Sequence, residues 1–122
     1  MSVQRRPLTG MVSSGVSAPR ALGTTDGLIH QLDTLSPQQG GTYIDVVTLM
    51  VANTTGEDIE VTVIVCGGAP VVQAVPANSS LMVFDQTPFQ AAANATGAST
   101  QIVGHSASAE SLVFWGWFAR PL

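Results

Sequence analysis

Residues 42–66 read TYIDVVTLMVAN-TTGE-DIEVTVIVC, and no other stretch of the chain is so regularly patterned. In its second half, apolar residues occupy every other position from Ile59 to Val65, with Glu60 and Thr62 between them. This period of two is typical of a strand with one face on a core and the other in water. Turn-forming residues from Asn53 to Glu57 separate the two halves. The stretch therefore predicts two long strands joined as a hairpin, with no candidate site on it.

The size and composition suit one soluble domain. The chain has 122 residues, of which 45% are apolar, enough for a modest core. No run approaches the ~18 apolar residues of a membrane helix. The region around Arg5 and Arg6 lacks the apolar segment of a secretory signal, so we expect synthesis in the cytoplasm and no membrane partner. Cys66 is the only cysteine, and we expect it to be buried as a small hydrophobic residue.

The charges are segregated along the chain. There is no lysine, and Arg5, Arg6 and Arg20 fall within the first 25 residues, which contain no acid. All eight acids lie from Asp26 to Glu110, so the first 25 residues carry +3 and the remainder, eight acids against one arginine, carries −7. A basic segment on an acidic body suits docking onto an acidic surface of another protein or of a neighbouring copy. Nucleic acid is a poor partner, because three scattered arginines bind phosphate weakly and the acidic body repels it.

Residues 1–25 show neither helical nor strand periodicity and are interrupted by Gly, Ser, Thr and Pro. This predicts an extended basic arm attached to a domain over residues 26–122. The arm also carries apolar residues, among them Leu8, Met11 and Val12. We expect it to be ordered when it lies on a partner and mobile when alone. The alternative is a solvated tail without a role.

Five further stretches are predicted to be strands, each bounded by turn-forming residues. They are residues 26–33, 71–75, 79–85, 100–107 and 111–119. Residues 87–94 are ambiguous between a strand and a helical turn, because Thr87 and Gln90 have capping-box spacing in a very short stretch. Together, about seven short strands and no long helix predict an all-β antiparallel β-sandwich, Ig-like or jelly-roll-like, with an extended N-terminal arm.

The last predicted strand, SLVFWGWFA over residues 111–119, is apolar on both faces. Phe114 and Phe118 share one face, and Trp115 and Trp117 share the other. That is too much apolar surface for a sheet exposed to water. Either both faces are internal, under the arm or a loop, or the tryptophans anchor a contact with another subunit, where Trp is enriched.

No catalytic, cofactor or metal motif occurs in the chain. There is no Gly-rich phosphate loop, HExxH motif, paired-cysteine zinc pattern or nucleophile elbow. His30 and His105 are interpreted as structural, because packed and hydrogen-bonded histidines are commoner than metal ligands, and His105 has no ligand partner at suitable spacing. We therefore expect no enzyme, no cofactor and no bound metal.

Three segments are similar to a known group of proteins. Residues 47–55 (VTLMVANTT), 61–65 (VTVIV) and 75–80 (VPANSS) resemble small β-sandwich proteins from the structural modules of tailed phages. In that family a long strand ends in an Asn-Thr/Ser turn, and a V-P-A-x-x-S/T step opens a later strand. A Gly/Ala/Ser-rich segment then precedes the last strand, as residues 91–108 do here. The similarity covers residues 42–118 and implies a virion accessory protein without catalytic residues.

These expectations combine into a phage virion structural protein, a capsid decoration (cement) protein that lays its arm across adjacent capsid subunits and so stabilises the shell. The alternative is a tail, neck or fibre component, such as a glycan-binding module with the two tryptophans as stacking platforms. The partners would be the major capsid protein or other virion subunits, together with further copies in a homo-oligomer. In this interpretation, the sandwich stays folded without residues 1–25. The expected interaction residues are Arg5, Arg6, Leu8, Met11, Val12, Arg20, Trp115 and Trp117.

Overall fold

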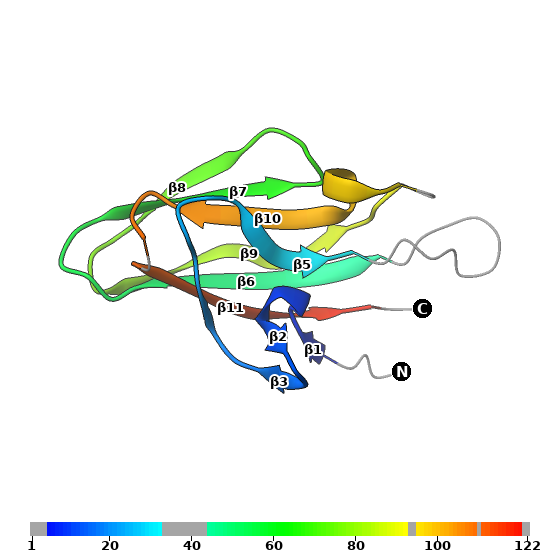
Figure 1. The fold of residues 1–122 in the computed structure, drawn as a ribbon, viewed down its shortest axis with the longest axis horizontal. Coiled ribbons are helices and arrows are strands. Elements are labelled where there is room, and N and C mark those ends of the chain that lie inside the picture. The colour runs from blue at the N-terminus through cyan, green and yellow to red at the C-terminus, as the bar shows by residue number, and fades with distance from the viewer. Residues whose placement is uncertain (1–4, 33–43, 93–94, 110, 121–122) are drawn as a thin grey trace.

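The computed structural model describes residues 5–32, 44–92, 95–109 and 111–120. In these residues the strands form two main antiparallel sheets packed face to face, and the only helical elements are two short 3-10 turns (Figure 1). The predicted all-β sandwich is therefore confirmed. Residues 42–43 of the patterned stretch, residue 33 of the first predicted strand and residues 93–94 of the ambiguous stretch lie outside the described residues.

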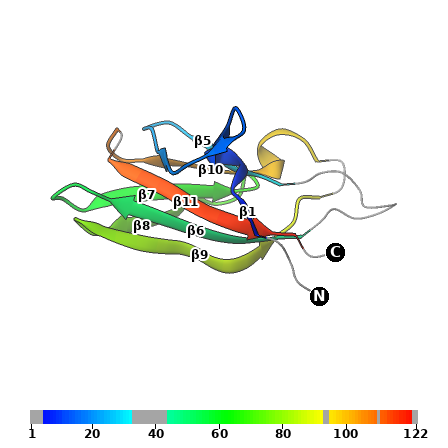
Figure 2. The same ribbon diagram turned by 90° about the horizontal axis from the view of Figure 1, so that it is seen from below.

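Figure 2 looks onto the first sheet, in which β11, β6 and β9 lie side by side, with the second sheet behind it. The first contains β1 (Arg5–Pro7), β4 (Arg20–Ala21), β6 (Asp45–Asn53), β9 (Ser79–Phe89) and β11 (Leu112–Ala119). The second contains β5 (Gly27–Gln31), β7 (Ile59–Val65), β8 (Val71–Val75) and β10 (Gln101–Ser106). The first sheet has the order β1-β11-β6-β9, with β4 also paired to β11, and the second has the order β5-β10-β7-β8. A separate small hairpin joins β2 (Val12–Ser13) to β3 (Val16–Ser17).

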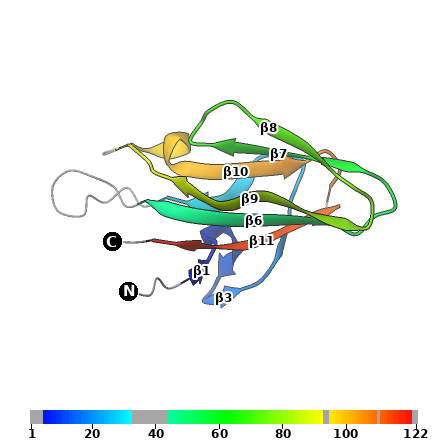
Figure 3. The same cartoon turned by 180° about the vertical axis from the view of Figure 1, so that it is seen from behind.

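The patterned stretch does not form a hairpin, so that prediction is wrong. Its first strand, β6, pairs with β11 and β9, whereas its second strand, β7, pairs with β10 and β8 in the other sheet (Figure 3). The connection crosses between the layers, and Asn53 organises it. The Asn53 amide donates to the carbonyls of Glu57 (2.6 Å) and Val75 (2.9 Å), and its oxygen accepts from the Thr55 N–H (2.9 Å). The alternation predicted which face of each strand is buried, but the two buried faces meet across the core.

The inward faces of both sheets share one core. On β11 every other residue is buried, which places Phe114 and Phe118 inside as predicted, while Trp115 and Trp117 point outward and are half-buried. The remaining core residues of the two sheets are apolar and almost fully buried: Ile29, Val47, Leu49, Val51, Val61, Val63, Val75, Ile102 and Leu112.

The arm closes one side of the sandwich. β1 and β4 pair with opposite ends of the same edge of β11, and between them the 3-10 turn η1 (Thr9–Met11) packs against β5. At Gly10 the arm approaches β5 so closely that a Cβ would overlap the carbonyl oxygen of Leu28. Leu8, Met11 and Leu22 are buried in the core. The described part of the arm is therefore packed on its own sandwich through these buried residues, while β1 and the β2–β3 hairpin are exposed.

The structure decides one ambiguity and corrects one local prediction. β9 extends through Phe89, so the first part of the ambiguous stretch is strand and the helical turn is not formed there. Cys66 follows β7 in a turn, with a left-handed backbone (φ 53°), and is half-buried instead of lying inside a strand. Partial burial raises the pKa of the Cys66 thiol, because it disfavours the thiolate. A second 3-10 turn, η2 (Gly97–Thr100), leads into β10.

Candidate functional site

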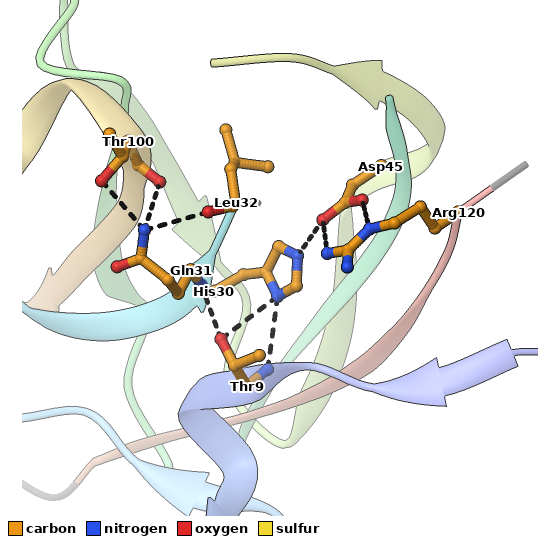
Figure 4. Close-up of polar contacts among 7 residues, drawn as sticks. All are labelled: Thr9, His30, Gln31, Leu32, Asp45, Thr100 and Arg120. Atoms are coloured by element: carbon orange, nitrogen blue, oxygen red, sulfur yellow. Dashed lines mark hydrogen bonds and ion pairs between the residues drawn. The ribbon is translucent and has the colours of Figure 1, made fainter. Parts of the chain in front are cut away.

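A buried polar network joins four segments that are far apart in the sequence (Figure 4). His30 on β5 contacts Asp45 at the start of β6, with 2.7 Å between Nε2 and Oδ2. Arg120, just beyond β11, donates to both carboxylate oxygens, from Nε to Oδ1 at 2.6 Å and from Nη2 to Oδ2 at 2.9 Å. On the other side of the ring, the Thr9 N–H donates to His30 Nδ1 at 3.3 Å. Nδ1 is thus an acceptor, and Nε2 carries the proton donated to Asp45.

The surroundings of the network favour an ionised Asp45. Burial raises the pKa of Asp45, but the hydrogen bonds from Arg120 and His30, together with the positive charge of Arg120, outweigh it and hold this pKa below its ordinary value. The Phe118 ring lies against both partners: its centroid is 4.3 Å from that of the His30 ring and 5.0 Å from the guanidinium carbon of Arg120. A planar guanidinium that binds both carboxylate oxygens fixes the geometry as well as the charge.

This network joins segments of the fold, and its His30–Asp45 pair is not accessible to a substrate. An acid next to a histidine is an arrangement that enzymes use for proton transfer. Here, however, His30 and Asp45 are both fully buried. The Thr9 hydroxyl oxygen, 3.3 Å from His30 Nδ1, accepts the Gln31 N–H at 2.5 Å and so is engaged in holding the arm to β5. His30 is therefore a packed, hydrogen-bonded residue, as predicted.

His105 also has a carboxylate partner, which its sequence neighbours do not supply. Its Nδ1 lies 2.7 Å from Oδ1 of Asp26, and both side chains are about one-third to one-half exposed. Among the described residues, no group of three or more His, Cys, Asp or Glu side chains is arranged to hold a metal ion. The pair fastens the segment before β5 to β10.

The structure divides the predicted interaction residues of the arm into two groups. Leu8 and Met11 are in the core, where the Gly116 N–H points at Met11 Sδ at 3.3 Å, so they bind the arm to its own body. Arg5, Arg6 and Val12 are exposed, and Val12 is 44% exposed. The remaining arm residue, Arg20, is half-buried on β4. Leu8 and Met11 are thus unavailable to another molecule in this conformation, whereas the other four arm residues reach the surface.

The predicted tryptophans lie on the outer face of the first sheet, within a larger apolar surface. Trp115 on β11 is opposite Met50 on β6, and Met50 is opposite Met82 on β9. These three residues are here called the Trp115 row. Met50 is half-buried and Met82 is 45% exposed. Part of Trp115 packs against the core cluster, but the row remains an outward-facing apolar strip across three strands.

Arg5 borders this strip. Its guanidinium carbon lies 5.0 Å from the centroid of the Trp117 ring, as in a cation–π contact. The pairing of β1 with β11 brings them together, since Arg5 is opposite Ala119 and Pro7 is opposite Trp117. The sequence analysis proposed Arg5 on the arm and Trp117 on the aromatic face as separate interaction residues, and the structure places them in contact within one chain.

Sequence reasoning missed several residues of these two clusters. Met50 could have been found, because it holds an outward position in the alternation of VTLMVAN. Asp45 and Arg120 had no comparable pattern, since they are 75 residues apart and meet only through the pairing of β6 with β11.

Comparison with protein-family models, curated proteins and solved structures finds no match for this chain. Within the described part of the chain, no helix is long and apolar enough to cross a membrane. The candidate site therefore rests on the geometry of its residues, and its strongest feature is the outer face of the first sheet.

Proposed function

We propose that this chain is a structural subunit of a phage virion, and specifically a capsid decoration protein that docks onto the shell through the outer face of the first sheet. The Trp115 row is the observation that carries the proposal. An apolar strip that a chain leaves partly exposed marks a contact with another protein, and Trp and Met are enriched in such contacts. Arg5 beside Trp117 adds a positive charge at the border of the strip.

The phage assignment is supported by the residues that resemble tailed-phage β-sandwich proteins. They form β6, β7 and the turn before β9, and they include Met50 of the Trp115 row. The proposed mechanism is mechanical. Each docked sandwich adds buried area between neighbouring shell subunits, and this added area raises the resistance of the shell to internal pressure.

The role proposed for the arm changes accordingly. Leu8 and Met11 anchor it internally, so it cannot be laid across a neighbour without opening the core. Its exposed residues, Arg6 and Val12 among them, remain available at the rim of a contact. The arm is thus part of the sandwich that docks, and it does not extend to a neighbouring subunit.

The copy number of the protein in purified particles tests the proposal. Hundreds of copies per particle are expected for a shell protein, whereas a dozen or fewer would assign it to the neck or tail. Met82→Glu should strongly reduce the amount bound to particles, and Val16→Glu, the same change on the exposed β2–β3 hairpin, should not. Absence of the protein from purified particles would contradict the proposal.

A glycan-binding module of a tail or fibre is the second candidate, since Trp115 and Trp117 lie two residues apart on a half-exposed face. Stacking on a sugar needs a free ring face, and the Arg5 guanidinium covers one face of Trp117. Tryptophan fluorescence during glycan titration separates the two candidates. Quenching with a spectral shift would favour the glycan module, and an unchanged spectrum would favour protein docking.

A further inference from the structure

The outer face of the second sheet carries an apolar row of its own. Leu28 on β5 is opposite Val103 on β10, and Val103 is opposite Ile64 on β7. These three residues are here called the Val103 row. Leu28 is 40% exposed and the other two are half-buried. The nearby Val72 on the edge strand β8 is 52% exposed and extends the surface. The sandwich therefore presents apolar rows on both of its opposite outer faces.

The two rows match each other in size. Each crosses three neighbouring strands, which are about 4.8 Å apart in any sheet, with its central residue, Met50 or Val103, on the middle strand. Laying one row on the other with Met50 over Val103 leaves two orientations. Trp115 then faces either Ile64 or Leu28.

The charges beside the rows distinguish the two orientations. In Figure 1, β11 and β10 run in opposite directions, and β1 and β5 lie on the same side of the sandwich. In the first orientation, Trp115 of one copy lies over Ile64 of the other. The Arg5 guanidinium beside Trp117 then lies over the end of β7 at which Glu60 of the other copy is exposed. With Trp115 over Leu28, Arg5 comes to Gln101 instead. Complementary charges favour the first orientation.

We propose that the outer face of the first sheet in one copy docks on the outer face of the second sheet in the next copy. The occupant of the Val103 row is thus the Trp115 row of a second copy, with Arg5 of one chain beside Glu60 of the other. This inference rests on the proposed function and assigns a second copy as the partner of the same face. In an open chain of copies, the first-sheet face of the terminal copy stays free and is the face that docks onto the shell. Because the contact joins two different faces, each added copy leaves one face free, and assembly continues into chains or closes into rings.

Sedimentation velocity of the purified full chain over a range of concentrations tests the contact. The wild type should form dimers and larger species as its concentration rises. Met82→Glu removes one face and Leu28→Glu removes the other, so each variant alone should stay monomeric. Both positions are at least 40% exposed, so the fold should tolerate them, and circular dichroism verifies this.

Mixing the two variants gives the decisive result. Met82→Glu keeps an intact second-sheet face and Leu28→Glu keeps an intact first-sheet face, so an equimolar mixture should form dimers and nothing larger. The control is Val16→Glu, which makes the same charge change at a 65% exposed position outside both faces and should assemble like the wild type. Arg5→Glu and Glu60→Arg should each weaken assembly about fivefold, as expected for a rim ion pair, and together should restore it.

Three results would overturn the inference. They are a wild-type chain that is monomeric at every concentration, assembly that depends on only one of the two faces, and a variant mixture that does not dimerise. A monomeric chain that still binds particles through Met82 would overturn the inference and leave the proposed function standing. Self-association of a chain that is absent from particles would overturn the proposed function and leave the inference standing.

Discussion

At the scale of single residues, the carboxylate of Asp45 holds together segments from both ends of the chain. It lies in the core, where an isolated charge would be strongly unfavourable, and it is stabilised by Arg120 and His30. Through His30 it also supports Thr9 on the arm. Removing one member of such a buried group takes hydrogen bonds and charge compensation away from the other members. The resulting loss of stability is larger than the net stability that the intact group contributes.

Asp45→Asn should lower the free energy of unfolding by about 3 kcal/mol, because the buried carboxylate bound by both Arg120 and His30 is lost. Chemical denaturation monitored by tryptophan fluorescence measures this change. The matched control is Glu60→Gln, which neutralises an exposed carboxylate on β7 and should change stability by no more than about 0.5 kcal/mol. Equal effects of the two substitutions would show that the buried network is not important for stability.

The same carboxylate predicts an acid dependence of stability. The pKa of Asp45 is lowered in the folded state, so its contribution is fully present above the unfolded pKa of about 3.9 and is lost as pH falls through the folded pKa. The stability difference between wild type and Asp45→Asn should therefore be constant near neutral pH and shrink below about pH 4. A difference that stays constant down to pH 2 would contradict this account.

Gly116 is predicted to be intolerant of any side chain. A Cβ at this position on β11 would overlap the carbonyl oxygen of Thr48 and come within 3.0 Å of Leu8 Cδ1. Gly116→Ala should cost about 3 kcal/mol, at the upper end for overpacking, because backbone has to move. Gly56→Ala is the control, since no atom lies within 4 Å of its Cβ position. Thermal unfolding of both variants tests the contrast.

At the scale of elements, β11 is the strand around which the first sheet is arranged. It pairs with β6 along its whole length, and its other edge is covered by β1 and β4. Without these two short strands, that edge would be an open template for pairing with other chains. The arm thus contributes edge protection, core residues and one end of the polar network.

Deleting residues 1–25 should therefore destabilise the sandwich, in contrast to the expectation from sequence. The deletion removes Leu8, Met11 and Leu22 from the core, and loss of even one buried Leu side chain costs about 2–5 kcal/mol. We expect loss of cooperative thermal unfolding and binding of a hydrophobic dye. Val16→Ser, in the exposed hairpin of the same arm, should leave unfolding unchanged. A truncated chain that unfolds like the full chain would show that the arm is dispensable.

At the scale of the whole molecule, charge and apolar surface are distributed over different parts of the sandwich. The arm supplies three of the four arginines, and the rest of the chain supplies all of the acids. Folding brings Arg5 to the first sheet and leaves Glu60 on the second. Opposite outer faces of one molecule thus carry complementary features, which suits a repeated contact between copies.

This distribution predicts a moderate salt dependence of self-association. The Trp115 and Val103 rows are apolar and insensitive to salt, whereas an exposed Arg5–Glu60 pair is screened as the Debye length falls from about 10 Å at 0.1 M to about 3 Å at 1 M. Raising the salt concentration over this range should weaken wild-type association a few-fold without abolishing it. For the Arg5→Glu variant, raising the salt concentration should not weaken association further, because the ion pair is already absent. Complete dissociation in high salt would show that charge, and not the apolar rows, drives the contact.

Local pattern predicted the parts of this protein that depend on neighbouring residues. The period of two identified β6, β7 and β11 and assigned Phe114 and Phe118 to the core, because a strand exposes alternate residues to the same environment. It also placed Trp115 and Trp117 together on the opposite face. The interaction surface was thus partly visible in the sequence, although its methionines were not included.

The sequence by itself determined the all-β class, the buried face of the main strands and the placement of Trp115 and Trp117 on one face of the last strand, whereas the structure showed that this face points outward. Only the tertiary structure decided that β6 and β7 belong to different sheets, that the arm contributes to the core, and that His30 and Arg120 meet on Asp45. These features depend on contacts between residues 15, 75 and even 105 positions apart. A period of two reports whether a strand face is buried, but it carries no information about which distant segment buries it.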